Sequence, residues 1–102
     1  METFGDIIKN ERENKGLLLR QVASALEIDQ AIVSKFERGE RKPSKNQVEK
    51  FADFYDLDKN KLITSWLSDQ IANTIPYEIN IEEVLVLAEE KAKYLKANQD
   101  GK

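Results

Sequence analysis

The stretch LLRQVASALEIDQAIVSKFERG, residues 18–39, is the most informative part of this chain for its fold. It holds two short segments in which apolar residues recur at helical spacing. These residues are Val22, Ala23 and Leu26 in the first segment, and Ile32, Val33 and Phe36 in the second. Asp29 can cap the second segment and Gly39 can end it. Only Glu27 and Ile28 join the two helices, so they must pack steeply across one another, as a helix-turn-helix does.

The second helix of this pair, residues 29–38, has an outer face suited to the major groove of DNA. The side chains not needed for packing are Gln30, Ala31, Ser34, Lys35 and Arg38. They are polar, small or basic, as a surface facing base edges and phosphates must be. An ordinary solvated helix face is the alternative interpretation.

The rest of the chain has helical spacing too, so we expect an all-α fold. The expected N-caps, besides Asp29, are Thr3, Ser44, Asp58 and Asn80. Pro76 interrupts the pattern and divides the chain into two parts. Residues 1–74 would form a five-helix domain, and residues 75–102 an appended C-terminal helix whose last residues, 98–102, fray.

The composition excludes several classes of function. The 102 residues suit one small domain, and neither cysteine nor histidine occurs among them. Disulfides, the common zinc sites and nucleophile–histidine catalysis are therefore excluded, so we expect neither an enzyme nor a cofactor. No small-molecule ligand is evident. The longest apolar run, Val84–Ala88, is too short to span a membrane, and no secretory signal is recognisable, so we expect a cytoplasmic protein.

The charge is unevenly distributed along the chain. The formal net charge is −3, which is unusual for a protein that binds nucleic acid. Residues 34–46, however, carry five basic and two acidic side chains, a local excess of +3, whereas residues 76–102 carry four lysines and six acids, or −2. Phosphates respond to the local field, so a basic patch on an acidic chain can still bind them.

These motifs together resemble the phage-repressor-like helix-turn-helix regulators, the Xre family, over about residues 3–67. The matching residues are Phe4-Gly5, Arg12, Gly16-Leu17, Val22-Ala23, Ile28, Val33-Ser34-Lys35-Phe36-Glu37-Arg38-Gly39 and Lys42-Pro43-Ser44. The resemblance implies a five-helix repressor-like domain that binds double-stranded DNA. It also implies a partly buried ion pair between Arg12 and Glu37.

The resemblance further implies roles for individual residues. Base contacts would fall to Gln30, Ala31 and Lys35, with Ser34 nearby; these side chains suit adenine, a thymine methyl and guanine respectively. Phosphate contacts would fall to Arg38, Arg41, Lys42, Ser44 and Lys45. The chain departs from the family at Leu18 and Leu19, where a Ser or Thr cap and a phosphate-binding Gln are usual. Arg20 can reach that phosphate instead, and Leu18 or Leu19 can pack against another chain.

The C-terminal helix has a second informative pattern. Ile81, Leu85, Ala88, Ala92 and Leu95 repeat in heptad-like steps of four and three residues. We expect a dimer contact from Trp66 onward that includes these residues, although Trp66 itself is typical of a core aromatic. The alternative is that this helix packs back on its own domain.

The sequence therefore predicts a sequence-specific DNA-binding transcriptional regulator. We expect a homodimeric repressor that reads an inverted repeat through residues 29–38. An antitoxin, or a regulator whose C-terminal helix holds a second protein, is the alternative. A controller of restriction–modification genes would also fit a chain of this size.

Overall fold

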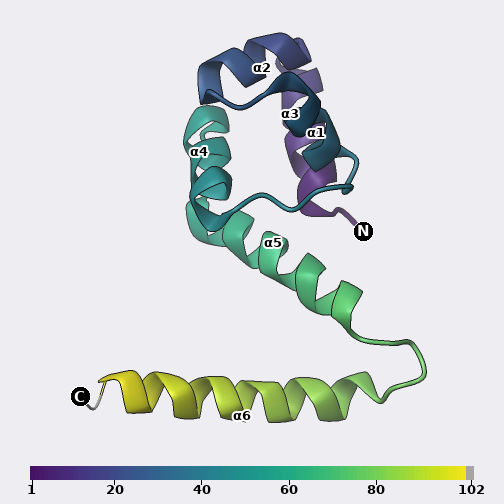
Figure 1. Cartoon of the computed structure of the whole chain (residues 1–102), viewed down its shortest axis with the longest axis vertical. Coiled ribbons are helices and arrows are strands. Elements are labelled where there is room, and N and C mark those ends of the chain that lie inside the picture. The colour runs from purple at the N-terminus through teal and green to yellow at the C-terminus, as the bar shows by residue number, and fades with distance from the viewer. Residues whose placement is uncertain (101–102) are drawn as a thin grey trace. The chain divides into compact units, whose positions relative to one another are not determined.

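The computed structural model describes residues 1–100, and it is all α-helical there, as the sequence predicts (Figure 1). The helices are α1 Phe4–Asn14, α2 Leu19–Leu26, α3 Gln30–Glu37, α4 Lys45–Tyr55, α5 Lys59–Thr74 and α6 Ile81–Asp100. Helices α2 and α3 follow each other directly and pack together, and α3 also packs on α1. This is the helix-turn-helix arrangement that residues 18–39 predict.

Side chains cap the helices where the sequence predicts caps. The Thr3 and Ser44 hydroxyls accept hydrogen bonds from the backbone N–H groups of Asp6 and Gln47, which complete reciprocal capping boxes. The Asp29 carboxylate accepts from the Ala31 N–H at 2.8 Å. Asp58 and Asn80 accept from the N–H groups three residues ahead, at 2.9 and 3.1 Å. Each cap satisfies a donor that the helix leaves unpaired, which explains why the helix starts follow from the sequence.

The turns depend on left-handed backbone at four positions. Gly16 and Gly39, with φ of 66° and 73°, stop the chain after α1 and α3 at no steric cost. Glu27 and Asp56 have φ of 57° and 56° and end α2 and α4. Glu27 carries a Cβ into this region, so the tight α2–α3 turn stores some backbone strain.

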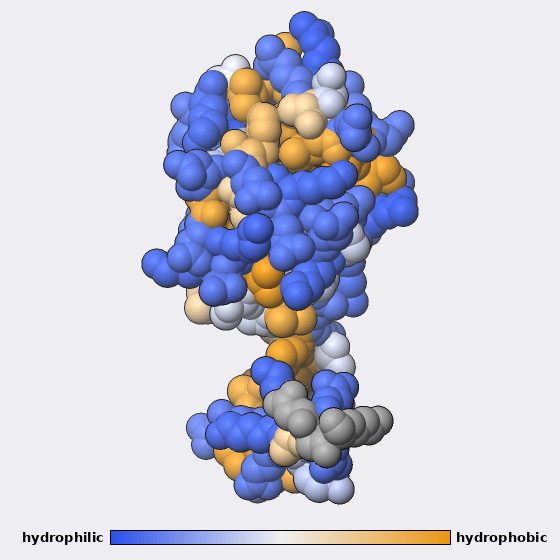
Figure 2. Space-filling view, turned by 90° about the vertical axis from the view of Figure 1, so that its left-hand side faces the viewer, coloured by the Kyte–Doolittle hydropathy of each residue, from blue (hydrophilic) through white to orange (hydrophobic). Residues whose placement is uncertain are grey.

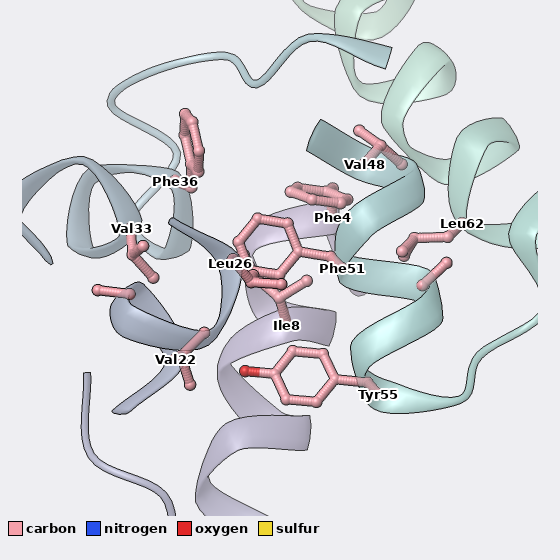
Figure 3. Packing of buried hydrophobic residues seen from close by; sticks show 12 residues of the cluster. Phe4, Ile8, Val22, Leu26, Val33, Phe36, Val48, Phe51, Tyr55 and Leu62 are labelled. Atoms are coloured by element: carbon pink, nitrogen blue, oxygen red, sulfur yellow. The ribbon is translucent and has the colours of Figure 1, made fainter. Parts of the chain in front are cut away.

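One apolar core holds α1 to α5 together. Its fully or nearly fully buried residues are Phe4, Ile8, Val22, Ala23, Leu26, Val33, Phe36, Val48, Phe51, Ala52, Tyr55 and Leu62 (Figure 3). The Phe51 ring is its centre, because it meets Phe4 edge-on at 5.9 Å and Phe36 at 6.2 Å between ring centroids. A single side chain of α4 thus joins α1 to α3, the helix with the exposed polar face.

The chain divides into two compact units within α5, one of residues 1–70 and one from residue 71 onward. The core belongs entirely to the first unit. In the second unit, every residue of α6 from 81 to 99 is exposed, apolar ones included, and Figure 2 shows apolar surface on this segment. Helix α6 includes residues 98–100, where we expected fraying, and residues 101 and 102 lie outside the described part. No helix among the described residues is long and apolar enough to cross a membrane.

Candidate nucleic-acid interface

Helix α3 is fixed from its inner side. Val33 and Phe36 are buried, with 0 % and 2 % of their surfaces exposed, and Glu37 is 8 % exposed. The turn before α3 is closed by a hydrogen bond from the Ile28 N–H to the Ala23 carbonyl at 3.0 Å, and Ile28 packs against the core. The small side chain of Ala23 lets the two helices approach. The inner half of an eight-residue helix is therefore rigidly held, which sets the direction of its outer half.

An ion pair fastens the end of α3 to α1. The Arg12 guanidinium donates to both Glu37 carboxylate oxygens, at 2.8 and 3.0 Å, and also to the Leu17 carbonyl at 3.0 Å. Only 14 % of the Arg12 side chain and 5 % of the Glu37 side chain are exposed. The hydrogen bond to Glu37 raises the pKa of Arg12, because it stabilises the charged guanidinium. The structure thus contains the pair that the family resemblance implies, with bidentate geometry.

Close backbone contact adds a second link between α1 and α3. A Cβ atom at Gly5 would lie 2.7 Å from the carbonyl oxygens of both Phe36 and Glu37. Only glycine fits at this crossing, since those neighbours are backbone atoms that cannot turn aside. The Phe4-Gly5 pair is a sequence signal for this contact, because a glycine inside a helix costs stability unless something approaches it closely.

The outer side of α3 leaves the expected DNA-reading residues at the surface. Gln30, Ala31 and Lys35 are exposed, and Ser34 is partly buried beside them. Their spacing of one, three and four residues places all four on one side of the helix. The Asp29 carboxylate is turned toward its own helix by the cap hydrogen bond, so it does not extend along this face.

Arg38, at the end of the same face, has a partner that the sequence does not reveal. Its guanidinium donates to both Glu40 oxygens, at 2.8 and 3.2 Å, and to the Ser34 hydroxyl at 2.6 Å. The ion pair raises the pKa of Arg38 and lowers that of Glu40. From the sequence, Arg38 is expected to be free for phosphate. In the structure its guanidinium is instead paired with the Glu40 carboxylate, although both side chains remain exposed.

The loop after α3 is basic and is anchored at one point. Arg41, Lys42 and Lys45 are exposed, whereas Pro43 is buried and its carbonyl accepts a hydrogen bond from Trp66 Nε1 at 3.0 Å. Trp66 is partly buried and packs against the core of its own unit, as we expected of a typical core aromatic. The three cations therefore extend from a loop whose position is set by the core.

At the start of α4, only some of the backbone N–H groups are available to bind an anion. The capping box uses the backbone N–H groups of Ser44 and Gln47, at 2.9 and 3.2 Å. The N–H groups of Lys45 and Asn46 then remain at this positive helix end. Ser44 thus serves mainly as a cap, and its hydroxyl retains its own proton for donation.

The start of α2 shows how the chain replaces the missing polar cap. Leu18 stands at the N-cap position and has no side-chain acceptor, but its N–H donates to the Gln21 side chain at 2.7 Å. Leu19 packs against the core, while Leu18 remains 49 % exposed. Arg20 is exposed at the first turn of α2, where the positive helix end adds to its charge.

A contact far apart in sequence closes the first unit. The Asp69 carboxylate of α5 accepts from the Phe4 N–H at 2.7 Å, at the start of α1. The two residues are 65 positions apart, so no local pattern signals their contact. A carboxylate at a helix N-terminus satisfies a free donor and also faces the positive end of the helix dipole.

The fold and this surface define a helix-turn-helix protein. Residues 3–62 match the helix-turn-helix domain family, and since they make up more than half of the chain, the chain belongs to that family. It is a DNA-binding transcriptional regulator and not an enzyme, and the resemblance read from its sequence is confirmed. No curated protein matches the chain.

Two solved structures are similar to the chain in fold. One is the clp gene regulator ClgR from Corynebacterium glutamicum, with 17 % identity, a TM-score of 0.55, and coverage of 93 % of this chain and 88 % of that one. The other is a chain of the SinR protein/SinI protein complex, with 19 % identity, a TM-score of 0.55, and coverage of 93 % and 99 %. At these identities the likeness shows the shared fold alone.

Proposed function

We propose that this chain is a homodimeric repressor that reads an inverted repeat in double-stranded DNA through the exposed face of α3. The observation that supports it is the contrast between the two sides of α3. Its inner side is locked by Val33, Phe36 and the Arg12–Glu37 pair, while Gln30, Ala31 and Lys35 are exposed on the outer side. A rigid helix with a free polar face can enter the major groove without losing much entropy. The proposal includes the cytoplasmic location that the sequence led us to expect.

The residues on this surface divide into two roles. Gln30, Ala31 and Lys35, with Ser34 beside them, contact base edges, where hydrogen bonds and a methyl contact distinguish sequences. Arg20, Arg38, Arg41, Lys42 and Lys45, with the Ser44 end of α4, contact phosphates. Phosphate contacts fix the position of the protein on the duplex but carry no sequence information directly.

The exposed apolar residues of α6 support the homodimer. Ile81, Leu85 and Leu95 are 50 %, 43 % and 60 % exposed, although a helix gains stability when such side chains are buried. A second copy would cover them and bring two recognition helices to one site. With two-fold symmetry, the half-site centres lie about 10 base pairs apart or a multiple of that.

Selection of bound sites from random duplex DNA tests the proposal. We expect one enriched motif with inverted symmetry. Gln30→Ala should then relax preference at one base pair in each half-site, at a cost of roughly 1–3 kcal/mol. Arg41→Ala, the matched control, should weaken all duplexes alike and reduce the salt slope by about one. A profile over all single-base variants that Gln30→Ala leaves unchanged would exclude Gln30 from base reading.

A second candidate function rests on the same exposure of α6. An antitoxin or partner-binding regulator would cover this helix with a different protein, and the SinR protein/SinI protein complex is a case of a protein with this fold in a complex. Sedimentation equilibrium of the purified chain separates the two. A dimer at tens of micromolar supports the homodimer, and a monomer with and without DNA supports the second candidate.

A further inference from the structure

The charges of α6 are separated into two halves of opposite sign. Residues 81–90 carry four glutamates and no basic residue, or −4, whereas residues 91–99 carry three lysines and no acid, or +3. Among the described residues, only one ion pair forms within this helix, between Glu89 and Lys93 at 3.7 Å. The remaining charges are exposed and face solvent.

The helix dipole does not account for this division. It favours acids in the first turn and bases in the last, and its effect falls off beyond them. Glu89 and Glu90 lie more than two turns from either end of α6, yet the sign changes only after them. A partner that carries the opposite charge along the same length would account for it.

A second copy of α6 meets this requirement in one orientation only. In a parallel pair the two acidic halves would lie side by side, as would the two basic halves, and like charges would repel along the whole contact. In an antiparallel pair each acidic half faces a basic half. The same helix is then electrostatically complementary to itself.

The apolar face gives a register for the antiparallel pair. If the two-fold axis passes near residue 90, Ala88 of each helix opposes Ala92 of the other, and Leu85 opposes Leu95. The small side chains meet at the axis, where the helices are closest, and the leucines pack on either side. In this register Glu82 of each helix approaches Lys96 of the other, which gives two ion pairs across the contact.

We infer that α6 pairs with α6 of a second copy in antiparallel orientation, with Glu82 of each copy facing Lys96 of the other. This inference rests on the proposed homodimer and specifies its geometry. Glu89 and Lys91 would each lie near their own counterparts at the axis. The Glu89 charge is already offset by Lys93, so these contacts oppose the pairing less than the aligned halves of a parallel pair would.

Thiol cross-linking of the full chain tests the orientation, because the natural sequence has no cysteine. Glu82→Cys and Lys96→Cys chains are treated with a short bifunctional maleimide, each alone and as an equimolar mixture. The antiparallel pair gives covalent dimer predominantly in the mixture. Covalent dimer from each variant alone, with no gain in the mixture, would overturn the orientation.

Sedimentation and DNA binding of the same variants separate this inference from the proposed function. A non-covalent dimer that binds duplex DNA but cross-links as a parallel pair leaves the proposed function intact and overturns only the geometry. A monomer that still binds duplex DNA overturns the homodimer, and with it this geometry, but not DNA recognition by α3.

Charge reversal gives a second readout that does not depend on cross-linking. Lys96→Glu alone should weaken the dimer about tenfold at low salt, because two ion pairs become two repulsions. Glu82→Lys combined with Lys96→Glu restores opposite charges at both contacts and should recover most of this loss. Failure of the combination to recover dimerisation, with circular dichroism showing α6 still helical, would overturn the Glu82–Lys96 contact.

Discussion

Helices α3 and α6 both have exposed side chains, but they differ in how much of each helix is buried. Helix α3 has only eight residues, and three of them, Val33, Phe36 and Glu37, are buried. Helix α6 has 20 residues, and every one from 81 to 99 is exposed, including seven large apolar side chains. The short helix is held by its own core, whereas the long one has its apolar face uncovered.

The difference shows that helix length is a poor guide to stability within this chain. An isolated eight-residue helix would be marginal in water, and tertiary packing makes α3 stable. The burial of Glu37 against Arg12 adds to that packing. Helix α6 is long enough to form by itself in part, and in the proposed homodimer a second copy would bury its apolar face. In the proposed function, DNA recognition thus requires the rigid helix, and dimerisation uses the exposed one.

The largest expected effect is on the α3 side of the comparison. Glu37→Ala leaves Arg12 charged and nearly buried, so the free energy of unfolding should fall by about 3–5 kcal/mol in urea titrations followed by circular dichroism. Arg12→Met combined with Glu37→Leu should recover much of the loss, because neither charge then remains. Glu40→Ala, which breaks the exposed pair with Arg38, serves as the control and should not change stability measurably. Additive losses in the double-mutant cycle would contradict the importance of the pair.

The next effect should appear on the α6 side and leave the core intact. Leu85→Asp places a charge in the proposed dimer contact, so dimerisation should weaken about a hundredfold in sedimentation equilibrium. The urea transition of the first unit should not move, because Leu85 is 43 % exposed and, among residues 1–100, none of the buried or partly buried core residues comes after Trp66. Val86→Asp makes a similar chemical change outside the heptad stripe and should leave the dimer intact. If Leu85→Asp unfolds the first unit, Leu85 belongs to the core of that unit, and the contrast between α3 and α6 is wrong.

A smaller effect is expected from the long-range cap on α1. Asp69→Ala removes the acceptor for the Phe4 N–H, and the free energy of unfolding should fall by about 1–2 kcal/mol. Asp69→Asn retains an acceptor oxygen without the charge, so it should lose only part of this stability. Equal losses from both variants would show that the charge, and not the hydrogen bond, stabilises the start of α1.

The smallest effect concerns the Tyr55 hydroxyl within the core (Figure 3). It is buried and has no hydrogen-bond partner among the described residues, so Tyr55→Phe should be neutral or stabilising by up to about 1 kcal/mol. Burial raises the pKa of Tyr55 from 10.0 to about 12. Between these values the unfolded chain loses the phenol proton more readily than the folded one, so stability falls as pH rises through this window.

Urea titrations at pH 7 and across the alkaline window measure both effects of Tyr55→Phe. The variant should lose less stability than the natural chain as pH rises from 10 to 12, because it lacks the ionising group. Tyr94→Phe, at a side chain that is 66 % exposed, is the matched control. Loss of stability at pH 7 in Tyr55→Phe would mean that the hydroxyl has a partner after all.

The helices and the position of the exposed face of α3, which we propose reads DNA, follow from the sequence alone. Caps at Thr3, Asp29 and Ser44 act within three residues, and the apolar spacing of α2 and α3 has a period set by the helix itself. Local hydrogen bonds and local periodicity depend only on neighbouring residues, so the order of amino acids is enough to predict them. The Arg12–Glu37 pair also followed, but through the family resemblance and not through spacing.

The contacts between residues distant in the chain, and the burial of each helix, emerge only in the folded molecule. The Asp69 carboxylate accepts a hydrogen bond from the Phe4 N–H, and Trp66 donates one to the Pro43 carbonyl. Both contacts join residues far apart in the chain, so no local sequence pattern predicts them. The Arg38–Glu40 pair is local, but both side chains have several rotamers, and the sequence does not select the one that pairs. The apolar pattern of α6 matches a packed helix as well as a dimerising one, so the sequence does not choose between the two. Burial depends on what the folded chain places next to a residue, and this is decided by packing over the whole domain.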